Sequence, residues 1–360
     1  MMKVIIVSYY FHEKGKMNFG PYPIIYQLGK DIGEVVAGGT TLKTNFLKSE
    51  MIDGIKVHRV FSPNILKIIN FSYFPFGIGL YNRFKNFHGI LHAQDIDACI
   101  GFWLLQEPIK VLTIRSFIRS WLLTIPKFKL TAKQKIRIEF LKKWEKMAVE
   151  NSDYIISPSE FYKKETIKYF DFPEEKITVI PNGVDEKFFS PRKIKTDKPI
   201  VLFAGGLSRR KGYDIVVDTF NRLRKKYRNM EFWILGAKGH LDGIKFFDRV
   251  PYCKMPEFYN KASIVIHPSW NENCPKVILE AMSCGKPVVT LNVTGNVELI
   301  DNEVDGIYAS KENFASEVGR LLDDEDLKEE MGRNARKKVL KKYTYGKMLR
   351  EYMKFYEEIE

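Results

Sequence analysis

Short runs of apolar, β-branched residues alternate with longer helical patterns along the chain, and this alternation limits the fold more than any other feature. In the first half, the expected strands are residues 4–7, 35–37, 57–60, 98–101, 111–114, 154–157 and 178–180. After a polar interruption the pattern resumes, with expected strands at residues 200–204, 231–235, 264–267 and 288–291. Strands separated by helices form parallel sheets. The sequence therefore predicts an α/β protein with two doubly wound, Rossmann-like domains.

A polar segment with two prolines and no apolar periodicity divides the two halves, as is typical of a linker. The chain of 360 residues also exceeds the length at which a single hydrophobic core keeps growing. We expect an N-terminal domain at residues 1–190, a linker at 191–198, a second domain at 199–340 and a C-terminal helix at 341–360. That helix needs a surface for its apolar residues, so we expect it to pack back toward the N-terminal domain. These residues are Met348, Leu349, Tyr352 and Phe355.

The formal net charge is +14, and residues 110–146 contain eleven Lys or Arg residues against two acidic ones. Such a surplus favours an anionic partner, which is nucleic acid, a lipid surface or a phosphorylated substrate. Here aromatic and aliphatic side chains lie between the cations, an arrangement that suits acyl chains and anionic headgroups. We therefore expect residues 110–146 to bind an anionic membrane surface peripherally. The cations nearest to apolar side chains are Arg115, Arg119, Lys127, Lys129, Lys133 and Lys135.

Residues 133–150 begin inside this basic region and end just after it. Their apolar side chains have the spacing of an amphipathic helix. Apolar side chains recur at Ile136, Phe140, Trp144 and Met147. The alternative to a membrane contact is therefore a solvated, lysine-rich helix face whose apolar side lies in the core.

Cysteine usage and the N-terminal sequence indicate a cytoplasmic protein. The cysteines form no C-x-x-C pair, so they predict buried, reduced thiols and neither a zinc site nor disulfides. Residues 1–7 enter an apolar run without the cleavage site of a signal peptide. No apolar run approaches the roughly 18 residues that span a bilayer. The four cysteines are Cys99, Cys253, Cys274 and Cys284.

Residues 203–212 combine a strand end, a glycine turn and a cluster of cations. Gly205 and Gly206 form the turn, and Arg209, Arg210 and Lys211 follow it. Glycines let backbone N–H groups approach a phosphate, and the cations can neutralise a diphosphate without a metal ion. The spacing differs from that of the nucleoside triphosphatase P-loop. A plain strand-to-helix turn with solvated cations is the alternative.

Two glutamates follow the expected strand at residues 264–267. Glu272 lies in the loop after this strand, and Glu280 lies on the next helix. Carboxylates accept hydrogen bonds from vicinal hydroxyls, so a pair at the carboxyl edge of a parallel sheet suits a sugar and a ribose. The alternative is a pair of surface glutamates near a helix start, where negative charge is favourable.

In their order and spacing, these segments resemble the family 4 glycosyltransferases of GT-B fold. The Glu-x(7)-Glu block followed by Ala-Met-x-x-Gly-x-Pro-Val, at residues 272–288, is its most specific part. The resemblance implies two domains that face a cleft. It also implies retaining, metal-independent transfer of a hexose-type sugar from a nucleotide-diphosphate sugar to a glycan or lipid-linked acceptor, without a cofactor. Further matching segments are the opening strand and residues 154–159, 180–185, 294–298 and 305–306.

The resemblance also implies roles on the phosphate side of the donor. Lys211 binds the diphosphate, and Gly205 and Gly206 let the loop approach it. Family members often have arginine where this chain has Gly206, so a second cation would have to come from Arg209 or Arg210, and we assign it to Arg210. Lys211 and Arg210 are thus expected to act as catalytic cations.

On the sugar side, the resemblance implies that Glu280 holds the ribose hydroxyls. Glu272, a further expected catalytic residue, contacts the transferred sugar together with the backbone after it. That backbone belongs to Asn273, Cys274 and Pro275.

Three residues of the first domain are candidates for the acceptor or sugar side. Gly20 lies in a loop that lacks the paired glycines of many relatives, and His92 follows a short apolar run and is expected to face the cleft. Arg115 stands where many relatives have a sugar-facing histidine, and an arginine cannot accept a hydrogen bond. We expect Arg115 either to neutralise a phosphate or to form a structural salt bridge.

Two other functions compete with sugar transfer. A basic nucleic-acid-binding protein fits the charge and the aromatic content, but it leaves both glutamates unexplained, so we expect no nucleic-acid partner. A nucleotide-sugar epimerase has a similar two-domain architecture, although the Glu-x(7)-Glu block favours transfer. No cluster of His, Asp, Cys or Glu accompanies the glycine turn, so we expect no metal site.

Overall fold

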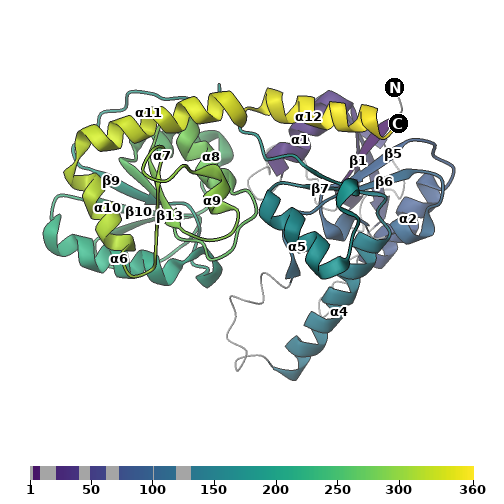
Figure 1. Cartoon of the computed structure of the whole chain (residues 1–360), viewed down its shortest axis with the longest axis horizontal. Helices are drawn as coiled ribbons and strands as arrows, with labels where there is room; N and C mark the ends of the chain where they lie inside the picture. The colour runs from purple at the N-terminus through teal and green to yellow at the C-terminus, as the bar shows by residue number, and fades with distance from the viewer. Residues whose placement is uncertain (1–2, 9–21, 40–48, 62–72, 100, 119–130) are drawn as a thin grey trace. The chain divides into compact units, whose positions relative to one another are not determined.

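The structure is a computed structural model that describes residues 3–8, 22–39, 49–61, 73–99, 101–118 and 131–360 (Figure 1). It divides into unit 1, Met1–Ile180 with Glu351–Glu360, and unit 2, Pro181–Arg350. The division therefore falls before the expected linker at residues 191–198, which lies inside unit 2 without helix or strand.

Hydrogen bonds explain why residues before the expected linker belong to unit 2. Phe189 is fully buried, and its carbonyl oxygen accepts hydrogen bonds from Ser283 Oγ at 2.6 Å and Arg336 Nη1 at 3.0 Å. Val184 N donates to Tyr343 O at 2.9 Å. These contacts attach the segment after Ile180 to unit 2, a connection that the polar composition of the linker did not reveal.

Unit 1 contains a parallel sheet with one antiparallel edge strand, in the order β3-β4-β2-β1-β5-β6-β7-β8. The chain alternates between strands and helices, as the apolar pattern predicts. The strands are β1 (Val4–Ser8), β2 (Glu34–Gly39), β3 (Ser49–Ile52), β4 (Ile55–Phe61), β5 (Ile90–Ala93), β6 (Ile109–Thr113), β7 (Tyr154–Ser157) and β8 (Ile177–Val179). The helices are α1 (Tyr22–Ile32), α2 (Tyr73–Phe84), α4 (Ala132–Glu150) and α5 (Glu160–Phe170), with the short 3₁₀ helices η1 (Ile96–Cys99), η2 (Phe102–Leu104) and η4 (Glu174–Lys176).

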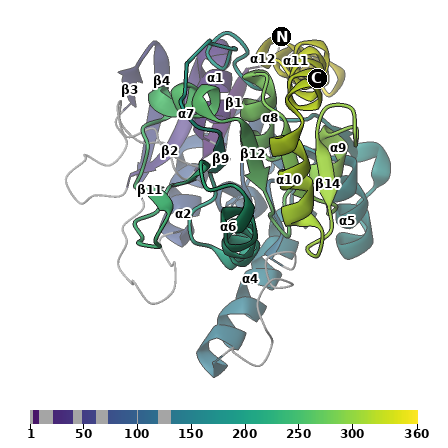
Figure 2. The ribbon, with the colours of Figure 1, turned by 90° about the vertical axis from the view of Figure 1, so that its left-hand side faces the viewer.

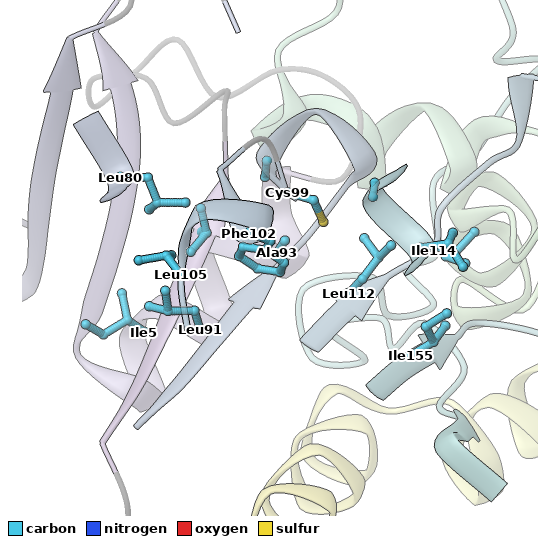
Figure 3. Packing of buried hydrophobic residues seen from close by; sticks show 14 of the residues in the cluster. Ile5, Leu80, Leu91, Ala93, Cys99, Phe102, Leu105, Leu112, Ile114 and Ile155 are labelled. Atoms are coloured by element: carbon cyan, nitrogen blue, oxygen red, sulfur yellow. The ribbon is translucent and has the colours of Figure 1, made fainter. Parts of the chain in front are cut away.

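The core of unit 1 forms where strand side chains meet the helices and η segments (Figure 3). Ile5, Leu91 and Leu112 of neighbouring strands are at most 1% exposed, as is Phe102 of η2. Full burial of such a side chain contributes about 1.5–3 kcal/mol. The β-branched runs therefore form central strands because both faces of a parallel sheet are covered.

Unit 2 contains a second parallel sheet, in the order β11-β10-β9-β12-β13-β14. Its strands are β9 (Ile200–Phe203), β10 (Glu231–Leu235), β11 (Ile244–Phe247), β12 (Ile264–His267), β13 (Val288–Leu291) and β14 (Ile307–Ala309). Its helices are η5 (Arg209–Lys211), α6 (Tyr213–Lys226), η6 (Tyr252–Lys254), α7 (Met255–Lys261), α8 (Lys276–Ser283), α9 (Asn296–Leu299), α10 (Phe314–Asp323), α11 (Glu325–Lys342) and the start of α12 (Tyr345–Glu358). Figure 2 turns this unit toward the viewer.

Two hydrophobic clusters cover the two faces of the unit 2 sheet. The helices α6 and α10 pack in one cluster, and α7, α8 and α11 pack in the other. The strand order reverses between β9 and β12, which are parallel neighbours although six other elements, among them β10 and β11, separate them in sequence. Ligands of doubly wound folds bind at the carboxyl ends of strands at such a switch point. The glycine turn after β9 and the loop after β12 both begin there.

The expected strand at residues 98–101 is wrong. Residues Ile96–Cys99 form η1 instead, and the strand of this region is the earlier β5. The Asp95 carboxylate accepts a hydrogen bond from Ala98 N at 2.8 Å, which stabilises a helical turn. The other expected strands are present within a few residues of their predicted ends.

Helix α4 is present, but only part of its apolar stripe lies in the core. The helix begins with a capping box between Thr131 and Gln134. Ile136 is 72% exposed and Phe140 is 48% exposed, whereas Glu145 is fully buried and accepts a hydrogen bond from Ile118 N at 2.8 Å. Ile136 and Phe140 therefore face solvent, whereas Trp144 of the same stripe packs against the core of unit 1.

The end of the chain forms α11 and α12 with a break at Tyr343 and Thr344, so the C-terminal helix expected at residues 341–360 is α12. The expected apolar positions Met348, Tyr352 and Phe355 are buried. The last residues of α12 belong to unit 1, in which the Phe355 ring packs edge-on against Tyr154.

Two further expectations concern the cysteines and membrane spans. Cys99, Cys274 and Cys284 are buried thiols, whereas Cys253 is exposed because it lies in the short η6 turn at the surface. In the part of the chain that the structure describes, no helix is long and apolar enough to cross a bilayer.

Candidate active site

The glycine turn after β9 brings two distant segments of unit 2 together. Gly206 has a left-handed backbone with φ of 65°, and its N–H donates to Leu235 O at 3.2 Å. Gly212 precedes α6, and a Cβ atom at this position would lie 1.9 Å from Pro268 O. Because Gly212 lacks this atom, the cationic segment before it lies directly against the loop after β12.

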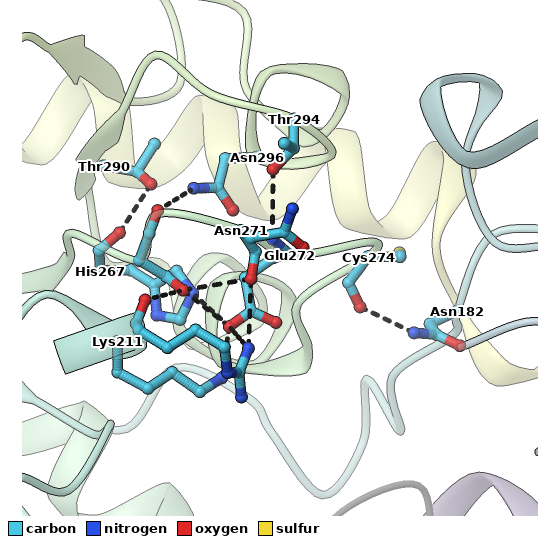
Figure 4. Close-up of polar contacts among 11 residues, drawn as sticks. Asn182, Lys211, His267, Asn271, Glu272, Cys274, Thr290, Thr294 and Asn296 are labelled. Carbon is cyan, nitrogen blue, oxygen red and sulfur yellow. Dashed lines mark hydrogen bonds and ion pairs between the residues drawn. The ribbon is translucent and has the colours of Figure 1, made fainter. Parts of the chain in front are cut away.

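The side chains of Lys211, Arg210 and Glu272 meet at this contact (Figure 4). Lys211 Nζ pairs with Glu272 Oε1, and Arg210 Nη1 lies 3.3 Å from the same oxygen. Ser269 Oγ also donates to this oxygen at 2.9 Å. The structure thus brings together the three residues that the sequence analysis assigned to catalysis.

The cations control the charge of Glu272. Burial alone would raise the pKa of this carboxyl group, but the positive charges of Lys211 and Arg210 and a contribution from His267 lower it to about 2. Glu272 is therefore ionised at neutral pH. One carboxylate and two cations leave a net positive charge at the start of α6, which suits a diphosphate.

Glu280 lies on α8 and is only 5% exposed. Tyr259 OH donates to its Oε2 atom at 2.8 Å. Burial has the largest effect and raises the pKa of Glu280 above its ordinary value. The charge of Lys276 and hydrogen bonds from Tyr259 and Tyr252 act in the opposite direction. The two tyrosines orient the carboxylate as a hydrogen-bond acceptor.

The backbone between Glu272 and α8 is held from both sides. Glu272 N donates to Thr294 Oγ1 at 3.1 Å, and Gly295 N donates to Glu272 O at 3.0 Å. Asn182 Nδ2 donates to Cys274 O at 2.7 Å. This network fixes the backbone of Asn273, Cys274 and Pro275, and Pro275 is the N-cap of α8. The segments around Asn182 and Thr294, which carried the family resemblance, therefore position the loop.

In unit 1, His92 does not face a solvent-accessible surface. It is fully buried in β5, with Nδ1 at 2.5 Å from Tyr356 OH and Nε2 at 2.7 Å from Thr113 Oγ1. Burial and then the charge of Arg115 lower its pKa to about 3, so the ring is neutral. The expected orientation toward the cleft was wrong because α12 covers the ring.

Arg115 follows β6 and is partly exposed. Its Nε donates to Gln94 O at 2.8 Å, and its Nη2 donates to Gln94 Oε1. Burial and the charge of Asp97 raise the pKa of the neighbouring Asp95 to about 7, and Arg115 opposes this shift. Arg115 is thus anchored by an amide and lies near a weakly acidic carboxyl group. Gly20 lies outside the described residues.

Three residues of the unit 2 site were not predicted: Ser269, Tyr259 and His267. Ser269 and His267 lie in the segment that contains Glu272, but no sequence spacing reveals which of its side chains contact the carboxylate. Tyr259 lies 21 positions before Glu280. Only the packing of α7 on α8 brings its hydroxyl to the carboxylate.

Two family models match the chain, which is consistent with this site. Residues 35–188 match the model described as Glycosyltransferase Family 4, and residues 184–338 match the model described as Glycosyl transferases group 1. Over its full length, the chain is 25% identical to the uncharacterized glycosyltransferase MJ1178 of Methanocaldococcus jannaschii, of which it covers 99%. It is 26% identical to the N,N'-diacetylbacillosaminyl-diphospho-undecaprenol alpha-1,3-N-acetylgalactosaminyltransferase of Campylobacter jejuni, over 54% of this chain and 58% of that one.

Solved structures share the fold at lower identity. Sucrose-phosphate synthase of Thermosynechococcus elongatus has a TM-score of 0.81 at 18% identity, and the match covers 99% of both chains. Alr3699/HepE of Anabaena in complex with UDP-glucose has a TM-score of 0.73 at 15% identity, covering 99% of this chain and 100% of that one. The fold and the matched domains define the chain as a GT-B glycosyltransferase. Within that class it belongs with the family 4 glycosyltransferases, as the sequence resemblance implied.

Proposed function

We propose that unit 2 binds a nucleotide-diphosphate sugar and that the enzyme transfers the sugar with retention of anomeric configuration. The convergence of Lys211 and Arg210 on a single carboxylate oxygen carries this proposal. The pair presents two fixed positive charges beside a glycine turn at the switch point of the sheet, where phosphates bind in doubly wound folds. The complex of Alr3699/HepE with UDP-glucose makes uridine the first base to test.

During transfer, the bond between the anomeric carbon and the diphosphate oxygen breaks, and the acceptor oxygen bonds to that carbon. Negative charge then grows on the leaving diphosphate, where Lys211 and Arg210 stabilise it. The acceptor hydroxyl approaches on the face from which the diphosphate departs, so its proton passes to a diphosphate oxygen. No covalent enzyme intermediate is needed.

The two glutamates recognise the hydroxyl groups of the donor. The Glu280 carboxylate, oriented by Tyr259, accepts hydrogen bonds from the ribose. Glu272 and the fixed backbone after it contact the transferred sugar. Because Lys211 and Arg210 offset part of the charge of the diphosphate, transfer does not require a metal ion. Within the described residues, no group of three or more His, Cys, Asp and Glu side chains has the arrangement of a metal site.

The acceptor is a glycan or a lipid-linked glycan. The name of the Campylobacter jejuni relative specifies a diphospho-undecaprenol acceptor, which supports a lipid-linked acceptor. Helix α4 supports it independently, because Ile136 and Phe140 are exposed and the nearby Lys135 and Lys143 are exposed cations. An exposed apolar stripe beside cations suits the surface of an anionic bilayer. We therefore propose that α4 binds such a surface peripherally from the cytoplasmic side.

Thermal unfolding with UDP, GDP and ADP tests donor binding. A ligand at about 100 times its dissociation constant adds about 2.7 kcal/mol to the stability of the protein that binds it. We expect one nucleotide to raise the melting temperature of the wild type and to have a smaller effect on Glu280→Ala. If none of the three changes the melting temperature, the proposed donor site is wrong.

A further inference from the structure

His267 is a buried histidine whose ring has no hydrogen-bond partner among the described residues. It ends β12, its side chain is 1% exposed, and both Nδ1 and Nε2 are unsatisfied. Buried polar atoms without partners are destabilising and rare in native proteins. The ring is not remote from the site, because Nε2 lies 3.8 Å from Glu272 Oε1 (Figure 4).

The ring therefore faces the carboxylate oxygen that the two cations hold. Charged groups of the described chain that act on His267 are Glu272, which favours its protonation, and Lys211 and Arg210, which oppose it. Burial is the largest influence and, together with these cations, lowers the pKa of His267 to about 4. While the cations remain on Glu272, the ring is neutral: it carries a single N–H group and no positive charge that could pair with the carboxylate.

A donor diphosphate competes for the same two cations. Its oxygens carry negative charge, so Lys211 and Arg210 cannot neutralise both the diphosphate and Glu272 as fully as they neutralise Glu272 alone. The carboxylate then keeps its hydrogen bond from Ser269 Oγ, and the His267 ring is the remaining group beside it. A shift of less than 1 Å would bring Nε2 within hydrogen-bond distance of Oε1.

We propose that His267 receives the Glu272 carboxylate when the donor diphosphate engages Lys211 and Arg210, and that the imidazole takes up one proton from solvent in this exchange. Nε2 is protonated and donates to Oε1, so the buried carboxylate keeps a charged partner. His267 is thus a positioning residue that acts through Glu272. The inference rests on the proposed donor site, and it couples donor binding to proton uptake.

Calorimetry of the intact wild-type protein tests the coupling. The probe is whichever of UDP-glucose, GDP-mannose and ADP-glucose stabilises the protein most, because a sugar nucleotide lacks the terminal phosphate that titrates near pH 6. Binding enthalpies measured in buffers of different ionisation enthalpy give the number of protons taken up. We expect net uptake of up to one proton between about pH 6 and pH 7 and binding that weakens as the pH rises.

Two matched variants separate this role from a structural one. His267→Gln keeps an amide donor for Glu272 but cannot be protonated, so we expect no proton uptake and no weakening of binding as the pH rises. His92→Gln removes another buried histidine, in unit 1, and is expected to keep the uptake of the wild type.

The outcomes distinguish this inference from the proposed function. Binding of the sugar nucleotide without proton uptake in the wild type would overturn the inference and leave the donor site intact. Uptake that persists in His267→Gln would also overturn it, since the proton would then reside on another group. Absence of binding for all three sugar nucleotides would contradict the donor site itself.

Discussion

At the scale of single residues, the Glu272 carboxylate connects the two segments that the sequence separates by about sixty positions. Its Oε1 atom interacts with Lys211, Arg210 and Ser269 at the same time. Lys211 and Glu272 were predictable because the family resemblance names them, and Arg210 was assigned because it is a cation beside Lys211. Ser269 and His267 were not, because a histidine at a strand end and a serine after it have no spacing that specifies their contacts. The residue types predict charge, whereas the partner of each charge depends on how the loop after β12 folds.

Replacing Lys211 with alanine should reduce turnover without unfolding the protein. Loss of one charged hydrogen bond costs about 1.5–3 kcal/mol, which lowers kcat/KM about 10-fold to 150-fold. Arg210 and Ser269 still hold Glu272, so the far-UV circular dichroism should not change. The control is Lys226→Ala, which removes an exposed lysine paired with Asp323 elsewhere in unit 2. Wild-type kcat/KM in Lys211→Ala would exclude Lys211 from the donor site.

Tyr259→Phe tests the orientation of Glu280. The hydroxyl lowers the pKa of this buried carboxyl group, so its removal should raise that pKa. Donor binding needs the ionised form, and the acidic limb of the pH profile of kcat/KM should therefore move to higher pH. Loss of one hydrogen bond of about 1 kcal/mol should also raise the donor KM about fivefold.

The control for this variant is Tyr308→Phe, which removes a hydroxyl that donates to Ile300 O away from Glu280. Its pH profile should match that of the wild type. Identical acidic limbs in Tyr259→Phe and the wild type would show that the hydroxyl does not control Glu280.

At the scale of elements, the alternating pattern predicts the strands well and the helix faces less well. Residues 98–101 resemble a strand because they are apolar, yet the Asp95 side chain binds Ala98 N and starts a 3₁₀ turn. Along α4, the spacing of apolar residues predicts a helix correctly but not what the stripe contacts. Periodicity identifies a face, and only the packing of the unit determines whether that face is covered.

The exposed half of α4 should bind anionic vesicles. We expect co-sedimentation with vesicles that contain anionic lipid, and this binding should weaken with rising ionic strength because salt screens the cations. Ile136→Ser with Phe140→Ser should reduce binding by removing the apolar contact. A second variant, in which Arg119, Lys127 and Lys129 become Gln, should reduce it by removing charge.

The control for the apolar variant is Met51→Ser, at a 66% exposed apolar residue of β3 in the same unit. It should bind vesicles as the wild type does. Equal recovery of the wild type with anionic vesicles, neutral vesicles and no vesicles would contradict the membrane proposal and leave the transferase assignment intact.

At the scale of the whole molecule, the presence of two α/β units was predictable because the same pattern occurs twice. Their limits were less predictable, since residues 181–189 look like the end of the first domain in composition. Buried Phe189 and its hydrogen bonds to Ser283 and Arg336 attach them to unit 2. Such contacts join residues distant in sequence, and no local pattern records them.

The intact enzyme should not depend on a divalent metal ion. In the proposed mechanism, Lys211 and Arg210 supply the positive charge that a metal ion would otherwise supply to the diphosphate. Initial rates should therefore be equal with EDTA, Mg²⁺ or Mn²⁺. Loss of activity in EDTA that Mg²⁺ or Mn²⁺ restores would contradict this mechanism.

Release of nucleoside diphosphate tests the central claim most directly. The enzyme is mixed with the sugar nucleotide that stabilises it and with lipid-linked or free glycan acceptors, and free nucleoside diphosphate and glycosylated product are quantified together. The account predicts equimolar amounts of both, dependent on acceptor and largely lost in Glu280→Ala. Conversion of the sugar nucleotide to its epimer without release of diphosphate, or release that is unchanged in Glu280→Ala, would contradict it.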